Sequence, residues 1–350
     1  MAAIRAGATL WGAPLAVGAV FTSATTAQTL PFSEPPLWEV GAMDTPREEV
    51  FGRIRDLAVG PDGSVYVLDD LTYVLRWFDA GGTYLGEAGR QGQGPGEFSA
   101  PFSVAVDADG LVHVLDPRNR RISVFGEGAA GLELKNDIPV VPARDLCVLG
   151  TRRFLLMYAG LAEGGMIHEV DNLGRTLNSF GELPRADPEM LRRFPTRAGE
   201  LRDQYGDGLI ACDTEYGRIV FAHSISAVVE AYTADGKALW DVSLPDYHQR
   251  SFVEGRRPGS IALAPDPKTN TAHTTAALAL VDGYVYVTLH EGSLADPEGS
   301  LELRVLRLRD GVEIARQPAK VLVAGHAPGW VVGFGQTPYP RVVAYSVGGD

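Results

Sequence analysis

A stretch between Gly52 and Phe125 that repeats itself once is the feature that most constrains the fold of this chain. Three residue pairs mark the repeat, each separated by 47 positions: Gly63 and Gly110, Asp69 and Asp116, Phe78 and Phe125. Each unit is too small to bury a core alone and must stack against its neighbours. A period near 45 residues with several short strands per unit predicts a radial array of small sheets.

Each repeat is predicted to form four strands. In the first unit these are Ile54–Val59, Ser64–Leu68, Tyr73–Phe78 and Thr83–Ala88, with a tight turn at Pro61-Asp-Gly63. Weaker versions of the pattern continue to the C-terminus. We therefore predict an all-β chain, a six-bladed β-propeller of four-stranded antiparallel blades in one domain over 28–350. The blades fall at about 52–98, 99–140, 141–185, 205–250, 270–318 and 319–350.

The last predicted blade is one strand short. A short apolar segment, Leu37–Val40, precedes the first blade and can supply the missing strand, so that strand 37–42 closes the ring. Such closure removes a sheet edge that would otherwise template aggregation.

Three connections are longer than a propeller needs. Asp187–Phe194 has the signals of a helix start, with Asp at the N-cap, Pro next and Pro195 to end it. The second connection is the proline-containing stretch Pro245–Thr275, and the third is His290–Ser300. All three would emerge on the same face, so we expect them to crowd one mouth of the central channel and to mark the functional face.

Charge and the N-terminus limit the partners and the compartment. The net charge is −13, which disfavours nucleic acid as a partner. Arg5, the uncharged run Ala6–Phe21 and the small residues Thr25-Thr-Ala27 resemble a signal peptide spanning 1–27. The apolar run is too short and glycine-rich for a membrane span. We expect an exported protein, periplasmic or extracellular, and a monomer because a closed ring leaves no edge to pair.

Blade two carries a resemblance to a known repeat. Gly110–Asp116, Asn119–Ile122 and Phe125, with the Gly-rich connection Gly89–Phe98, are similar to the NHL repeat. Blade one departs from the pattern, with Leu71-Thr-Tyr where the family has Asn-x-Arg. The chain thus resembles exported six-bladed propellers of the NHL type. The resemblance implies the architecture but not the activity, because such proteins include protein-binding platforms, ligand-binding propellers and metal-dependent lyases and lactonases.

The ends of the second strand of each blade give the candidate ligand-binding face. These positions are Asp69, Asp116, Tyr158, His223, His290 and Gln336, and Arg118 lies beside Asp116. Carboxylates and imidazoles around a channel could bind a divalent cation, with His223, His290 and Asp116 as ligands. Alternatively, the Asp side chains hold the adjacent loops through backbone hydrogen bonds, as is common in NHL repeats.

Other patterns favour structural interpretations. The Gly89–Phe98 loop has no helix after it and lacks Gly-Lys-Ser/Thr, so we interpret it as a connector between blades and not as a phosphate loop. His113 lies in mid-strand and is expected to pack. His168, His248, His273 and His326 share no spacing with metal-ligand motifs, and Arg185, Arg192, Arg193, Arg197 and Arg202 form either a solvated helix face or an anion clamp.

Two cysteines occupy equivalent positions in the first strands of neighbouring blades. Cys147 and Cys212 could form a disulfide in an oxidising compartment if their Cα atoms come within ~7 Å. Adjacent sheets pack about 10 Å apart, which slightly favours two buried thiols. The sequence leaves both states open.

The sequence contains neither His-Glu-x-x-His nor Gly-x-Ser-x-Gly. We therefore expect a non-catalytic module without a cofactor, which binds a protein, peptide or small ligand through its loop-rich face. The alternative is a metal-dependent lyase or lactonase with the ion at the channel mouth.

Overall fold

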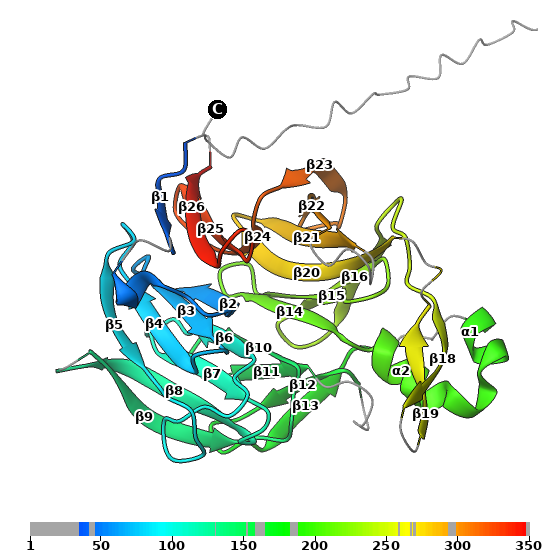
Figure 1. Cartoon of the computed structure of the whole chain (residues 1–350), viewed down its shortest axis with the longest axis horizontal. Helices are drawn as coiled ribbons and strands as arrows, with labels where there is room; N and C mark the ends of the chain where they lie inside the picture. The colour runs from blue at the N-terminus through cyan, green and yellow to red at the C-terminus, as the bar shows by residue number, and fades with distance from the viewer. Residues whose placement is uncertain are drawn as a thin grey trace, which may run out of the picture.

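The computed structural model describes residues 35–41, 46–129, 131–151, 153–157, 165–182, 188–257, 260–266, 268, 271–292 and 299–347. The predicted signal peptide at 1–27 lies outside them. In this part of the chain the strands form six four-stranded sheets and one two-stranded sheet, and the six-bladed propeller is confirmed (Figure 1). No helix among the same residues is long and apolar enough to cross a bilayer.

Five blades follow the chain in order from the inner strand outward. Blade one consists of β2 (Ile54–Val59), β3 (Val65–Asp69), β4 (Val74–Phe78) and β5 (Tyr84–Ala88), and blade two of β6 (Ser103–Val106), β7 (Val112–Asp116), β8 (Arg121–Gly128) and β9 (Gly131–Pro139). Blade three consists of β10 (Asp145–Leu149), β11 (Arg153–Met157), β12 (Ile167–Val170) and β13 (Thr176–Phe180), and blade four of β14 (Gly208–Asp213), β15 (Arg218–His223), β16 (Val228–Thr233) and β17 (Ala238–Ser243). Blade five consists of β20 (Ala272–Val281), β21 (Tyr284–Gly292), β22 (Ser300–Arg307) and β23 (Glu313–Ala319).

The sixth blade combines both ends of the described chain. Strands β24 (Leu322–Ala327), β25 (Trp330–Gly335) and β26 (Arg341–Ser346) are completed by β1 (Trp38–Val40), which pairs antiparallel with β26. Trp38 lies opposite Ala344, and Val40 lies opposite Val342. The predicted closure by an N-terminal strand is thus seen in the structure.

The hydrophobic core lies between the blades. One cluster of buried side chains fills each of the six interfaces, for example Val65 with Val332 between the first and last blades and Leu68 with Val114 between the first two. Alternate residues of each strand face opposite sides of its sheet, so one strand contributes to two clusters. The Gly-rich connection after β5 behaves as a connector, because Phe98 is fully buried in the second of these interfaces.

The two long connections on either side of blade four form a side lobe. We use this name for α1 (Pro188–Arg193), a 3-10 turn (Pro195–Arg197), α2 (Ala198–Tyr205), and the hairpin of β18 (Phe252–Arg257) and β19 (Ser260–Pro265). The lobe has its own small core, in which the rings of Tyr205 and Phe252 lie 6.1 Å apart. The sequence predicted the first helix but neither α2 nor the hairpin.

We expected the long connections to crowd one mouth of the channel, but the side lobe that two of them form does not cover it. In Figure 1 it projects outward from the ring, away from the inner strands. The third long connection is also shorter than predicted, because β21 continues to Gly292 and β22 begins at Ser300. His290 therefore lies within a strand, opposite Thr274 and Leu301.

Candidate functional site

Asp69 and Asp116 hold loops together. The Asp69 carboxylate accepts hydrogen bonds from the backbone N–H groups of Gly52, Arg53, Leu71 and Thr72, and from the Arg76 guanidinium at 3.0 Å. Asp116 accepts from the backbone of Ser99, Ala100, Arg118 and Asn119. Both side chains are completely buried. Burial alone would raise the pKa of Asp69, but these backbone donors lower it, as expected for a loop-holding carboxylate.

The remaining predicted face residues lie apart from one another. His223 is buried, and its Nδ1 donates to the Tyr205 carbonyl at 3.0 Å, which attaches the side lobe to blade four. Arg118 is exposed, and His290 is half-buried in β21. Gln336 donates to the Ile54 carbonyl across the ring closure. Tyr158 lies outside the described residues.

The structure does not bring the predicted metal ligands together. In the described part of the chain, one group of three metal-ligating side chains has its ligand atoms within 4.8 Å of one another, and it consists of His248, His273 and Glu291. His223, His290 and Asp116 are not members of it. They come from three different blades, His223 from blade four, His290 from blade five and Asp116 from blade two.

His113 packs in the protein interior as predicted, whereas the arginine set can be described only in part, because Arg185 lies outside the described residues. His113 is buried, with Nε2 3.0 Å from Asp107 Oδ2 and its ring against Phe154. Arg192 and Arg193 are exposed on α1, while Arg197 pairs with Glu200 at 2.6 Å. No residue of the side lobe lines the channel cavity described below.

The two cysteines are joined in a disulfide. The Cα atoms of Cys147 and Cys212 lie 5.6 Å apart, within the range that a disulfide spans. The sheet spacing that slightly favoured free thiols applies to sheets packed face to face. Here β10 and β14 are both inner strands, and they converge toward the channel.

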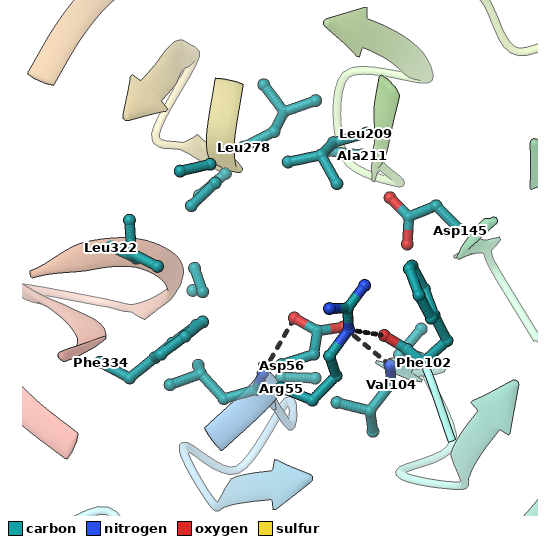
Figure 2. Close-up of a pocket in the computed structure, with 18 of the residues that line it drawn as sticks. Arg55, Asp56, Phe102, Val104, Asp145, Leu209, Ala211, Leu278, Leu322 and Phe334 are labelled. Carbon is teal, nitrogen blue, oxygen red and sulfur yellow. Dashed lines mark hydrogen bonds between the residues drawn. The ribbon is translucent and has the colours of Figure 1, made fainter. Parts of the chain in front are cut away.

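The central channel holds a cavity with a volume of about 1000 Å³. It is lined by the inner strands of all six blades. Figure 2 shows that its walls differ in character. Arg55, Asp56 and Asp145 lie on the side of blades one to three, whereas the labelled side chains of blades four to six are apolar, namely Leu209, Ala211, Leu278, Leu322 and Phe334. Polar residues also line the cavity on that second side, namely Asp207, Ser224, Thr274, Thr275, His326 and Gln336.

Asp56 and Asp145 occupy equivalent positions at the start of their inner strands. One oxygen of Asp56 accepts from the Val104 N–H at 2.8 Å, and one oxygen of Asp145 accepts from the Ile210 N–H at 2.8 Å. Each carboxylate thereby links its blade to the next one. The other oxygen accepts the N–H of the following residue, Leu57 or Leu146. A carboxylate oxygen has two lone pairs, so both groups keep the capacity to accept from a ligand.

The electrostatics of the channel oppose full ionisation of these acids. Burial, reinforced by the Asp145 charge, raises the pKa of Asp56 to about 7. Burial raises the pKa of Asp145 to about 6 and also raises that of Asp207 at the start of β14. A positive charge brought among these groups would be stabilised by them.

Arg55 supplies the opposite charge on the same wall. Its guanidinium lies over the Phe102 ring, with Cζ 3.5 Å from the centroid, and Nε donates to the Phe102 carbonyl at 3.4 Å. Burial lowers the pKa of Arg55, although guanidinium remains charged at neutral pH. Arg144 is an exposed second cation among the cavity-lining residues. A third guanidinium, that of Arg53, also lies among the lining residues and pairs with Asp70 at 2.6 Å. The three carboxylates thus face three guanidiniums, one of which is already compensated by Asp70.

Sequence reasoning missed these channel residues, although a signal for them was present. Ile54–Val59 was predicted as an innermost strand, and in a propeller this strand lines the channel. A charged pair at its start, Arg55-Asp56, is repeated as Arg144-Asp145 before the inner strand of blade three. Among the predicted face positions that the structure describes, a set without Tyr158, only Gln336 lines the cavity.

The fold and its cavity define the class of this protein: it is a six-bladed β-propeller. A family model described as a 6-bladed beta-propeller matches residues 30–149. That segment contains blades one and two, where the repeat is clearest. None of the curated proteins compared with the chain matches it.

Solved structures show the same architecture at low sequence identity. A member of the duf4221 family from Bacteroides vulgatus is 11% identical, with a TM-score of 0.54, over 85% of this chain and 92% of that one. A protein of Bacteroides fragilis that is assumed to be exported is 8% identical, with a TM-score of 0.53, over 93% and 96%. Virginiamycin B lyase from Staphylococcus aureus is 10% identical, with a TM-score of 0.50, over 88% and 98%. These likenesses concern the fold alone.

Proposed function

We propose that this chain is an exported, non-catalytic binding module that takes a small amphipathic cation, or the amino end of a peptide, into its central channel. The observation that carries the proposal is that the charged side chains Arg55, Asp56 and Asp145 face the apolar side chains Leu209, Leu278 and Leu322 across the channel (Figure 2). Ligand pockets combine apolar side chains with a few polar groups that fix the orientation of the ligand, and both kinds of side chain line this cavity.

The sign of the ligand charge follows from the polar wall. Asp56, Asp145 and Asp207 all have raised pKa values. They outnumber the lining cations Arg55 and Arg144, because the third lining cation, Arg53, is paired with Asp70. An ammonium group placed among these carboxylates would be attracted to them and would donate hydrogen bonds to the lone pairs that their oxygens have left. The apolar body of the ligand would lie against Leu209, Leu278 and Leu322.

Export is supported by two independent features. The N-terminal sequence resembles a signal peptide, and the bond between Cys147 and Cys212 suits an oxidising compartment. The similar structure from Bacteroides fragilis is also assumed to be exported. We also propose that blades one and two are repeats of the NHL type, on the sequence resemblance described above.

The proposal is tested with three matched probes: 2-phenylethylamine, 2-phenylethanol and 3-phenylpropanoate. We expect ligand-observed NMR and calorimetry at pH 8 to detect the amine best and the carboxylate least, because Asp56 and Asp145 are then ionised. The variant Asp145→Asn should weaken amine binding about tenfold, the loss of roughly 1.4 kcal/mol from one ionic contact.

Asp109→Asn is the matched control, since Asp109 is exposed in a turn and does not line the cavity. It should bind the amine as the wild type does. Equal binding of the amine and the alcohol, or tighter binding of the carboxylate, would contradict the assignment of ligand charge. Absence of binding by all three probes would contradict the channel as the site for this class of ligand.

A further inference from the structure

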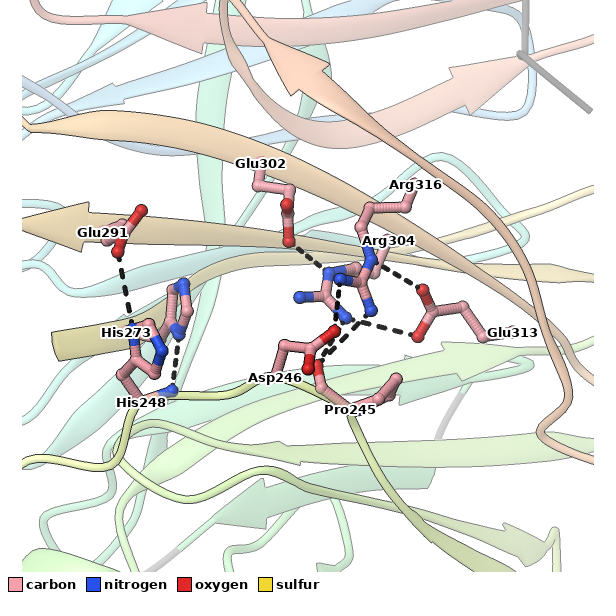
Figure 3. Close-up of polar contacts among 9 residues, drawn as sticks. All are labelled: Pro245, Asp246, His248, His273, Glu291, Glu302, Arg304, Glu313 and Arg316. Atoms are coloured by element: carbon pink, nitrogen blue, oxygen red, sulfur yellow. Dashed lines mark hydrogen bonds and ion pairs between the residues drawn. The ribbon is translucent and has the colours of Figure 1, made fainter. Parts of the chain in front are cut away.

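Three metal-ligating side chains meet where the connection that leads to the hairpin of the side lobe passes the ends of two strands of blade five. His248 lies in the connection from β17 to β18, His273 near the start of β20, and Glu291 near the end of β21 (Figure 3). His273 and Glu291 are directly opposite each other across the β20–β21 ladder. The ligand atoms of the three side chains all lie within 4.8 Å of one another.

The backbone fixes His248 in this position. Its carbonyl accepts from the His273 N–H at 2.9 Å, and its own N–H donates to His273 Nδ1 at 2.8 Å. The Tyr247 hydroxyl donates to the carbonyls of Ser224 and His273, both at 3.1 Å. The connection is therefore held on the end of blade five before any ligand is considered.

The side chains converge in a geometry that suits coordination. His248 Nδ1 is 3.6 Å from Glu291 Oε1, and the two imidazole rings are stacked with centroids 5.1 Å apart. His273 is buried, whereas 60% of the His248 side chain is exposed, which leaves an approach from solvent. A separation of 3.6 Å is close to that of two atoms bound to one ion at 2.0–2.2 Å.

The proton of the neutral His273 ring lies on Nε2, so Nδ1 keeps a lone pair that can coordinate a metal ion. Since Nδ1 accepts the His248 N–H, the neutral ring carries its proton on Nε2. The neutral imidazole is the form that coordinates metals. A bound ion would take over the Nδ1 lone pair from the His248 amide, which requires a small shift of that backbone.

The neighbouring positive charge is already compensated. Arg304 is buried and pairs with Glu302 and Glu313, and it donates to the Pro245 carbonyl at 3.0 Å (Figure 3). Arg316 pairs with Asp246 and Glu313, at 3.0 and 3.1 Å. Glu291 is not drawn into these pairs and faces the two imidazoles.

We propose that His248, His273 and Glu291 form a binding site for a divalent zinc-class ion, with water at the remaining coordination position. Two imidazoles and one carboxylate suit Zn²⁺ better than Mg²⁺ or Ca²⁺, which prefer oxygen ligands. The ion would join the connection that carries β18 to the end of blade five. It would stabilise the attachment of the side lobe to the ring.

The test is titration of the tag-free, chelator-treated and dialysed mature protein with ZnCl₂ by calorimetry. We expect one ion per chain, a rise in the thermal unfolding midpoint with Zn²⁺, and no competition from excess Mg²⁺. His248→Ala and Glu291→Gln should each weaken Zn²⁺ binding by more than about 100-fold, since even outer-shell changes cost 10–100-fold.

His326→Ala is the matched control, because His326 pairs with Asp282 at 3.8 Å and is not a member of the group. It should bind Zn²⁺ as the wild type does. His248 is exposed, so its replacement should leave the folded state intact, which the unfolding midpoint without metal verifies. Unchanged Zn²⁺ binding in both ligand variants, or no binding by the wild type at micromolar Zn²⁺, would overturn the site.

Discussion

Aspartate side chains have two different roles in this ring: some hold loops in place and others face the channel. The hydrogen-bond partners around each carboxylate determine its role. Asp69 and Asp116 are fully buried, and each accepts four backbone N–H groups. Asp56 and Asp145 face the channel, where each accepts only two. The carboxylates of Asp69 and Asp116 therefore use their lone pairs in hydrogen bonds to the loops, whereas those of Asp56 and Asp145 can still accept hydrogen bonds from a ligand.

Replacement of Asp56 by Asn should change how stability depends on pH. Burial raises the pKa of Asp56 in the folded state to about 7, above its usual value of 3.8, so the folded state binds this proton more tightly than the unfolded state. This contribution is fully present below pH 3.8 and is lost as the pH rises to about 7. Between pH 5 and pH 8 the wild type should therefore lose more stability than Asp56→Asn, by on the order of 2 °C in unfolding midpoint.

Thermal unfolding of both proteins at several pH values in one buffer series measures this difference. Asp109→Asn serves as the control and should parallel the wild type, because Asp109 is exposed. If the curves of the wild type and Asp56→Asn run parallel, the Asp56 carboxyl is not perturbed.

At the scale of elements, the sequence predicted what depends on local pattern. Alternating apolar residues and Asp-Gly or Gly-containing turns placed the strands of the blades and the N-terminal closing strand. The hairpin β18–β19 was missed because its stability is not local. Phe252 packs on Tyr205, some fifty positions earlier in the chain, and proline residues near the hairpin concealed its alternation.

The disulfide is the one covalent link between elements far apart in sequence, as far as the structure describes the chain. Cys147 and Cys212 are 65 residues apart, and a link across that span stabilises by about 4 kcal/mol in the chain-entropy description. The double variant Cys147→Ala/Cys212→Ala should unfold at correspondingly lower urea concentration.

Reductant should shift the urea midpoint of the wild type toward that of the double variant and leave the variant unchanged. The variant removes both thiols, so it also controls for effects of reductant elsewhere. A wild-type midpoint that is insensitive to reductant after full unfolding and refolding would show that the link adds no stability.

At the scale of the whole molecule, the candidate site was harder to predict than the fold. The channel gathers short pieces of six strands that are tens of residues apart, so no spacing in the sequence marks their meeting. His248, His273 and Glu291 illustrate the same limit, since they lie in three segments and fit no ligand motif. By contrast, a 47-residue offset is visible without any three-dimensional information.

Removal of the closing strand should open the ring. A chain lacking residues 37–41 would leave the outer edge of β26 without its partner, and such an edge pairs readily with other chains. We expect a lower unfolding midpoint and concentration-dependent association, measured by light scattering coupled to size exclusion. Glu39→Ala keeps the backbone pairing and should remain like the wild type, because its exposed ion pair with Arg341 contributes little. A deletion variant that stays monomeric and equally stable would show that β1 is dispensable.

The antiparallel pairing of β1 with β26 also determines how the molecule would respond to force. Since Trp38 lies opposite Ala344 and Val40 opposite Val342, the chain enters β1 and leaves β26 at the same end of the pair. Tension applied between the two termini would therefore peel the strands apart one hydrogen bond after another, instead of shearing all of them together. We therefore expect the ring, which six packed interfaces stabilise, to open first at the β1–β26 pair, and at a lower force than shearing of that pair would need.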